Sequence, residues 1–147
     1  MKPQKQIIPR SLRLFAGLLL LAIGPRIAVA EDADVAVELN KLEEQGGGCR
    51  IHLVIRNSTE QPFETYKLDL VLFGRDGIIA RRIAVEVAPL RAKKKSVKLF
   101  DVADLACPAV GSILINDVLQ CRSGGADRAD CIDGLDASSR AGIELTK

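Results

Sequence analysis

Apolar and polar residues alternate through much of the chain, a pattern typical of β-strands with one buried face. The alternation predicts strands around residues 35–39, 49–55, 66–72, 79–87, 96–100 and 113–118. Asp76-Gly77 lies between two of these runs and predicts a tight hairpin, whereas Asn57-Ser58-Thr59 predicts a turn. Short strands at hairpin spacing predict an all-β fold, an antiparallel β-sandwich of six or seven strands.

The chain becomes polar and acidic after Cys121. We therefore expect one domain over residues 31–121, followed by a polar C-terminal loop or tail over residues 122–147. Acidic residues recur at every third position of this segment: Asp127, Asp130, Asp133 and Asp136. Calcium-binding loops place their ligands at every second position and end in a glutamate, so a solvated segment is the better interpretation.

The first 30 residues have the three parts of a secretory signal peptide. Residues 2–13 carry four basic and no acidic side chains, residues 14–23 are mostly apolar, and Ala28-Val29-Ala30 forms a cleavage motif. Residues 1–30 are therefore predicted to form a cleaved signal helix, and the lack of a twin arginine there favours the general secretory route. An uncleaved signal that tethers the protein to a membrane is the alternative. The apolar run is, however, shorter than the roughly 20 residues that span a bilayer.

Removal of the signal changes the sign of the net charge. The whole chain has 21 basic and 19 acidic residues and a formal net charge of +2. Residues 1–30 contain five basic and no acidic residues, so the mature chain keeps 16 basic against 19 acidic residues, a net charge of −3. A mildly acidic domain has no overall attraction to nucleic acid or to an anionic membrane. We expect no nucleic-acid partner, and a membrane contact only if the signal stays uncleaved.

Four cysteines remain in the mature chain, an even number that predicts two disulfides in an exported protein. If successive strands run antiparallel, Cys49 and Cys107 lie at one end of the sandwich and Cys121 lies at the other. A bridge from Cys107 to Cys121 would have to span a strand of roughly 30 Å, whereas bridged Cα atoms lie about 4–7 Å apart. The expected disulfides are therefore Cys49–Cys107 and Cys121–Cys131.

The stretch from residue 37 to residue 121 resembles a family of small exported proteins of Gram-negative bacteria, known as Tat pathway signal sequence domain proteins. The motifs that carry the resemblance are the strand at residues 68–72, Asp76-Gly77, Ile79-Ala80-Arg81-Arg82, Ser96-Val97-Lys98-Leu99-Phe100-Asp101, Ala106-Cys107, Asn116-Asp117-Val118 and Cys121. The resemblance implies an exported, immunoglobulin-like antiparallel β-sandwich and no established activity. The chain departs from the family's label because its first residues contain no twin arginine. A more general similarity to FxLYD-type β-sandwich domains rests on the D-G turn and the basic loop before a strand.

Residues that could support catalysis or metal binding are few. His52 is the single histidine, so a Ser–His or Cys–His pair has one possible base, and no G-x-S-x-G motif occurs. Cys49 and His52 differ by an odd number along a strand, so they face opposite sides and do not form a zinc site. We expect no catalytic residues, no metal and no cofactor.

Six basic residues form the most unusual local feature of the chain. They lie in and after the strand at residues 79–87: Arg81, Arg82, Arg91, Lys93, Lys94 and Lys95. One interpretation is a site for an anionic partner such as a lipid phosphate, a glycan or an acidic protein. The other is a lysine-rich guard that prevents strand edges from pairing with other chains. No aromatic residues accompany the cluster, which argues against binding of single-stranded nucleic acid.

These observations favour a non-enzymatic interaction module that works in the periplasm and binds a protein or another component of the envelope. Two alternatives remain open at this point. One is a membrane-tethered version of the same domain, and the other is a redox or hydrolytic helper with an unrecognised site.

Overall fold

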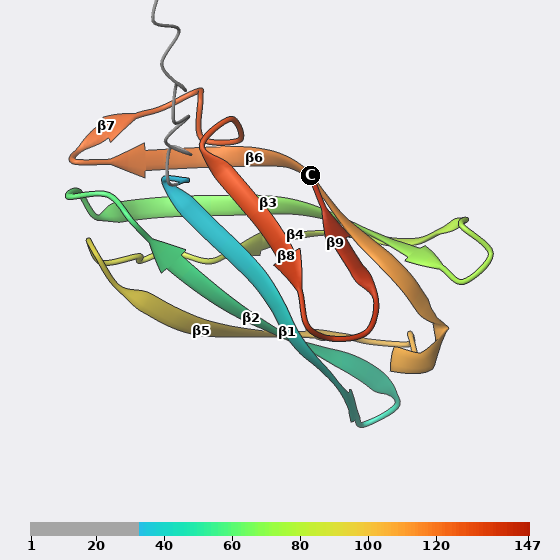
Figure 1. The fold of residues 1–147 in the computed structure, drawn as a ribbon. Helices are drawn as coiled ribbons and strands as arrows, with labels where there is room; N and C mark the ends of the chain where they lie inside the picture. The colour runs from blue at the N-terminus through green and yellow to red at the C-terminus, as the bar shows by residue number, and fades with distance from the viewer. Residues whose placement is uncertain (1–32) are drawn as a thin grey trace, which may run out of the picture. The chain divides into compact units, whose positions relative to one another are not determined.

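The computed structural model describes residues 33–147, so the predicted signal peptide at residues 1–30 lies outside the described residues. Nine strands and one short 3-10 helix make up the described residues (Figure 1). The strands are β1 (Val35–Gln45), β2 (Gly48–Asn57), β3 (Phe63–Gly74), β4 (Ile79–Glu86), β5 (Lys95–Val102), β6 (Val110–Ser123), β7 (Ala126–Asp127), β8 (Leu135–Ser139) and β9 (Glu144–Thr146). The 3-10 helix η1 (Cys107–Ala109) precedes β6. No helix in this part of the chain is long and apolar enough to cross a membrane.

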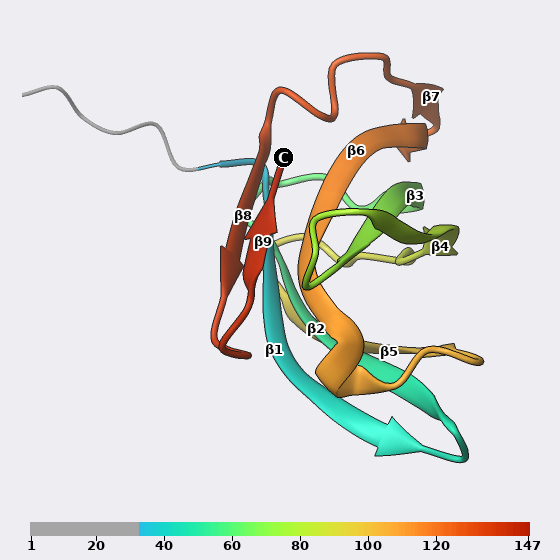
Figure 2. The same ribbon diagram turned by 90° about the vertical axis from the view of Figure 1, so that its right-hand side faces the viewer.

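The strands form two sheets that lie one over the other. One sheet has the order β5-β2-β1-β8, and the other has the order β4-β3-β6-β7, with β9 also paired to β6. Figure 2 shows the two layers from the side, with β1 and β8 in one layer and β3 and β4 in the other. In immunoglobulin-like domains the first, second and fifth strands share one sheet, and the third and sixth share the other. Strands β1, β2 and β5 in one sheet and β3 and β6 in the other follow this order, whereas β4 pairs with β3. The predicted β-sandwich is confirmed.

The core lies between the sheets and follows the alternation of the sequence. In β3, the side chains of Tyr66, Leu68, Leu70 and Leu72 are buried and face the partner sheet. The rings of Phe63 and Tyr66 meet edge to face, with their centroids 5.1 Å apart. Burial of such side chains is the main favourable contribution to folding, about 1.5–3 kcal/mol for each large apolar residue.

The segment after Cys121 differs from the prediction, because it is part of the sandwich. β8 pairs in parallel with β1, and β9 pairs in parallel with β6. Cys131, Leu135 and Leu145 are buried in the core. The sandwich therefore has nine strands instead of six or seven, and two of its strand pairs are parallel. The composition of the segment did not reveal β8 and β9, because both strands are short and each places a single large apolar residue in the core.

Both expected disulfides are present in the structure. Cys49 is bridged to Cys107 with a Cα–Cα separation of 4.8 Å, and Cys121 is bridged to Cys131 with a separation of 6.4 Å. The first joins β2 to the 3-10 helix, and the second joins the end of β6 to the segment before β8. The Tyr66 hydroxyl donates a hydrogen bond to the backbone oxygen of Cys131 at 3.1 Å, which attaches the second bridge to the core.

Asn57 anchors the predicted turn at residues 57–59. Its buried side-chain amide donates hydrogen bonds to the backbone oxygens of Gln61 (2.9 Å) and Leu90 (3.2 Å). Its side-chain oxygen accepts hydrogen bonds from the backbone N–H and the hydroxyl of Thr59. Because Leu90 lies in the connection between β4 and β5, this network also fixes the start of that connection.

Candidate partner-binding surfaces

The six basic residues do not form one surface. Arg81 and Arg82 lie near the start of β4, where Arg81 pairs with Leu72 of β3. The connection between β4 and β5 instead meets β3 at its other end, where Leu90 pairs with Phe63. Leu72 and Phe63 are nine positions apart along β3, which corresponds to roughly 30 Å. The structure therefore separates Arg81 and Arg82 from a basic loop that consists of Arg91, Lys93, Lys94 and Lys95.

Arg82 makes an ion pair on the outer face of its sheet. Its guanidinium donates two hydrogen bonds to the buried carboxylate of Asp69, at 2.9 and 2.7 Å. The side chain of Asn116 donates a third hydrogen bond to the same carboxylate at 2.7 Å. The hydrogen bond from Arg82 is the main cause that holds the pKa of Asp69 below its usual value. Arg82 thus compensates a buried charge across β3 and β4, a role that its position in a basic cluster did not predict.

The Asp69 network predicts a specific dependence of stability on pH. Because the pKa of Asp69 is lower in the folded chain than in the unfolded chain, its ionised form favours folding above pH 4. This contribution is lost as the pH falls through the folded-state pKa. We expect Asp69→Asn to lower the free energy of unfolding more at pH 7 than at pH 3, measured by urea denaturation at both pH values. An equal loss at the two pH values would contradict this assignment.

The basic loop is exposed, as its position between two strands predicts. Lys93 makes an ion pair with Glu60 at 2.9 Å, and both side chains are largely exposed, so this pair contributes little to stability. Within residues 33–147, no carboxylate lies within ion-pair distance of Arg91, Lys94 or Lys95. The loop therefore carries several positive charges without a carboxylate in direct contact, although Lys95 lies near enough to Glu38 to be a minor cause of the lowered pKa of that carboxyl.

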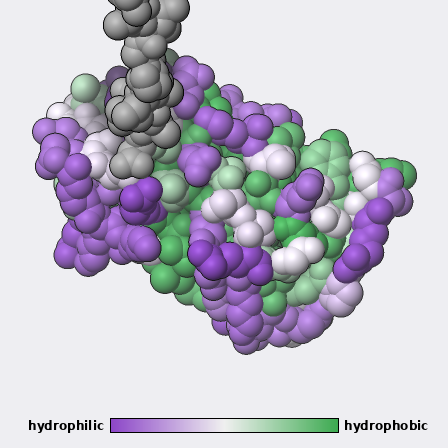
Figure 3. Space-filling view, viewed as in Figure 1, coloured by the Kyte–Doolittle hydropathy of each residue, from purple (hydrophilic) through white to green (hydrophobic). Residues whose placement is uncertain are grey.

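A second surface, which the sequence analysis did not identify, lies at the turn between β3 and β4. Ile78 is 68% exposed and Ile79 is 59% exposed, although neighbouring strand residues normally face opposite sides. The space-filling view in Figure 3 shows apolar side chains that reach the surface over this hairpin. The turn itself is ordered by hydrogen bonds. Gly77 donates to the backbone oxygen of Gly74 at 2.9 Å, and the N–H of Ile78 donates to the Asp76 carboxylate at 3.0 Å.

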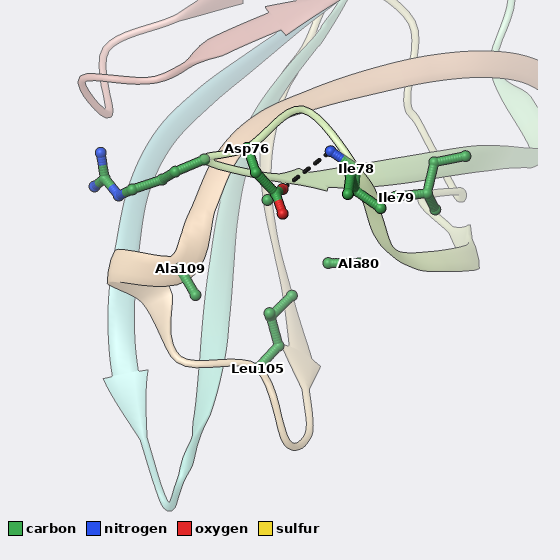
Figure 4. Close-up of a pocket in the computed structure, with 8 residues that line it drawn as sticks. Asp76, Ile78, Ile79, Ala80, Leu105 and Ala109 are labelled. Carbon is green, nitrogen blue, oxygen red and sulfur yellow. Dashed lines mark hydrogen bonds between the residues drawn. The ribbon is translucent and has the colours of Figure 1, made fainter.

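An open hollow of about 450 Å³ lies beside this turn. In Figure 4, Leu105 and Ala109 lie across the hollow from Asp76 and Ala80. Two arginines connect the hairpin to the segment that carries Leu105. Arg75 donates to the backbone oxygen of Pro108, and Arg81 donates to that of Asp104 at 3.5 Å. We call the two exposed isoleucines and this hollow the hairpin tip. The consecutive isoleucines after Asp76-Gly77 were the available signal, because strict alternation leaves at least one of them in solvent.

A third apolar surface lies on the outer face of the other sheet. Val97 and Leu99 of β5 are 60% and 52% exposed. They pair with Val54 and His52 of β2, and Figure 3 shows apolar surface over these two strands. Strand β5 is at the edge of its sheet.

The structure places His52 and Cys49 on opposite faces of β2, as predicted. Cys49 is buried in its disulfide, whereas an imidazole nitrogen of His52 lies 2.8 Å from the Glu43 carboxylate on the outer face. The hydrogen bond with His52 is the main cause that lowers the pKa of Glu43. Among residues 33–147, no group of three potential ligands converges in a way that could hold a metal ion. This arrangement leaves His52 as the hydrogen-bond partner of Glu43 on the outer face of the sheet.

Comparisons with known proteins support the fold. No protein-family model matches the chain, and no curated protein matches it in sequence. One solved structure that resembles it is that of IrmA from Escherichia coli, with a TM-score of 0.52 and 11% sequence identity. The superposition covers 71% of this chain and 91% of that chain. At this identity the similarity shows a shared β-sandwich, and the resemblance to the exported family stays a prediction. The two disulfides are consistent with an oxidising compartment outside the cytoplasm.

Proposed function

We propose that this protein is a non-enzymatic interaction module of the periplasm that binds an envelope protein through its hairpin tip. The observation that carries the proposal is the pair of exposed isoleucines beside an apolar hollow. Exposed apolar patches next to polar residues mark sites of protein association more often than isolated surface residues do. The two disulfides and the predicted signal peptide support the location.

The chemistry of the hairpin tip favours a protein side chain as its occupant. Small-molecule sites enclose their ligands and contain several converging polar groups. This hollow is instead open, and apolar side chains line it together with the charged residues Arg75 and Asp76. An aromatic or long aliphatic side chain of a partner could fill it, as anchor residues do at the centre of interfaces. Arg75 and Arg81 flank the hollow, so the partner should present a carboxylate beside its apolar anchor.

The hairpin is held in place before any partner binds, which supports a role in binding. Arg75 and Arg81 connect it to residues 104–108, and Cys107 in that segment is bridged to β2. A site that is ordered in advance loses less conformational entropy on association than a mobile loop does.

The proposal predicts the result of an affinity-capture experiment. The bait is the full-length chain produced with its own signal and purified from the periplasm. Replacement of Ile78 and Ile79 by aspartate should weaken binding of the captured and identified partner at least tenfold, because it replaces two apolar side chains that line the hollow with charged ones. The free energy of unfolding should change by no more than about 0.5 kcal/mol, since both residues are exposed.

Leu119→Asp is the matched control, because Leu119 is a similarly exposed apolar residue of β6 outside the hairpin tip. It should leave the affinity for the purified partner unchanged. If Leu119→Asp and the isoleucine variant weaken binding equally, the loss reflects general surface polarity, and the hairpin tip is not the site.

A further inference from the structure

We infer that the free edge of β5 is a second binding site, at which an extended segment of a partner protein adds a strand to the sheet. The acidic end of that segment would lie beside the basic loop. This inference concerns a different surface from the hairpin tip and does not depend on it.

The hydrogen-bond pattern of β5 shows which backbone groups are available at this edge. The N–H of Asn57 donates to the backbone oxygen of Lys94 at 3.0 Å, which defines the alternation of the β2–β5 ladder. In an antiparallel pair, every second residue bonds the neighbouring strand and the residues between them point away. Ser96, Lys98 and Phe100 therefore bond β2. The backbone groups of Val97 and Leu99 point to the free edge, where no strand of residues 33–147 pairs with them.

The side chains of this edge also suit an added strand. Val97 and Leu99 present apolar surface on the outer face of the sheet, next to the half-buried Val54 of β2. An added strand with apolar residues at alternate positions would cover this surface while its backbone bonds the edge. Natural edge strands usually carry charged residues that discourage such pairing. The side chain of Lys98 instead points toward the connection before β5 and donates to the backbone oxygen of Ala88 at 3.4 Å.

The basic loop sets the charge of the partner segment. Arg91 and Lys94 precede β5, and Lys95 is its first residue. Within residues 33–147 no carboxylate lies within ion-pair distance of these three side chains, and Lys93 has only the exposed pair with Glu60. A strand that extends past Lys95 would place its end residues among these positive charges. Acidic residues at that end complement the loop, whereas basic residues there are repelled. The occupant is therefore an extended protein segment with an acidic end followed by alternating apolar residues.

Synthetic peptides test this inference directly. The protein for the test is expressed as the full-length chain and purified after export. Three fluorescein-labelled peptides contain the same alternating valines and threonines. Two carry three glutamates at the amino or the carboxyl end, and the third carries three lysines. Fluorescence anisotropy measures the binding, and we expect at least one glutamate peptide to bind ten times more tightly than the lysine peptide. The glutamate peptide that binds more tightly shows the direction of the added strand. Reversal of Lys93, Lys94 and Lys95 to glutamate should remove this preference. Equal binding of all three peptides would overturn the inference.

Two variants and one measurement locate the peptide. Val97→Pro removes an outward-pointing N–H without breaking a hydrogen bond to β2, so it should reduce peptide binding at least tenfold. Val97→Thr is the control, because it keeps the N–H and should bind the peptide. Amide hydrogen exchange of the unmodified protein gives an independent readout, in which the peptide should slow exchange at Val97 and Leu99 at least tenfold. Unchanged exchange at both amides under saturating peptide would refute the site, even if the proline variant failed to fold. The Ile78 and Ile79 double variant should bind the peptide normally, and a loss there would assign the peptide to the hairpin tip.

Discussion

Leu135→Ala and Leu145→Ala should each lower the free energy of unfolding by about 3 kcal/mol, because both leucines are buried in the core. Truncation of a buried leucine removes apolar contacts and leaves a cavity that the surrounding residues fill only in part. Urea denaturation followed by circular dichroism measures both values. In a polar loop or tail, the same substitutions would change stability by no more than about 0.5 kcal/mol.

Asp136→Ala is the matched control for Leu135, since it alters the next residue of β8, whose side chain is exposed. It should leave the free energy of unfolding within about 0.5 kcal/mol of the unmodified protein. A small effect of both leucine variants would show that β8 and β9 contribute little to the sandwich.

Loss of the Cys49–Cys107 disulfide should have the other large effect. A bridge stabilises the fold by restricting the unfolded chain, and the restriction grows with the length of the loop that it closes. The two bridged pairs are 58 and 10 positions apart in sequence. Replacement of Cys49 and Cys107 by serine should therefore cost about 4 kcal/mol, and replacement of Cys121 and Cys131 about 3 kcal/mol.

Chemical denaturation of both serine variants without reductant measures this order. Mass spectrometry of the unmodified protein after treatment with an alkylating reagent should detect no free thiol, which establishes the reference state. A greater loss from the Cys121 and Cys131 variant would mean that native contacts around the second bridge, such as the Tyr66 hydrogen bond, outweigh the effect of loop length.

The sequence predicted the first six strands because apolar residues recur at alternate positions along most of them, although residues 68–72 of β3 are buried on both faces and Val85 is the one buried residue of β4. In β2, for example, Ile51, Leu53 and Ile55 alternate with exposed or half-buried residues. The disulfide pairing followed from the same pattern, since alternating strand directions place Cys49 and Cys107 at one end. These features depend on neighbours in the chain, which is why a single sequence was sufficient to predict them.

The features that the sequence did not predict depend on contacts between distant segments. β8 and β9 each contribute one large core residue, so local periodicity cannot distinguish them from a loop. The role of Arg82 became visible only when β3 and β4 paired and placed it beside Asp69. The hairpin tip likewise requires Leu105, which approaches Ile78 through the path of the chain after β5.

The pairing of β1 with β8 has a consequence for the order in which the protein folds. Val35 pairs with Leu135, about a hundred positions later in the chain. The first strand of residues 33–147 therefore gains one of its two neighbours from a segment that is synthesised much later. Contacts between such distant residues form slowly, because a long loop must close before they stabilise anything. The sheet therefore stays incomplete until residues 135–139 are available to pair with β1. One side of β1 is unpaired during that time, and unpaired strand edges make folding intermediates prone to aggregation.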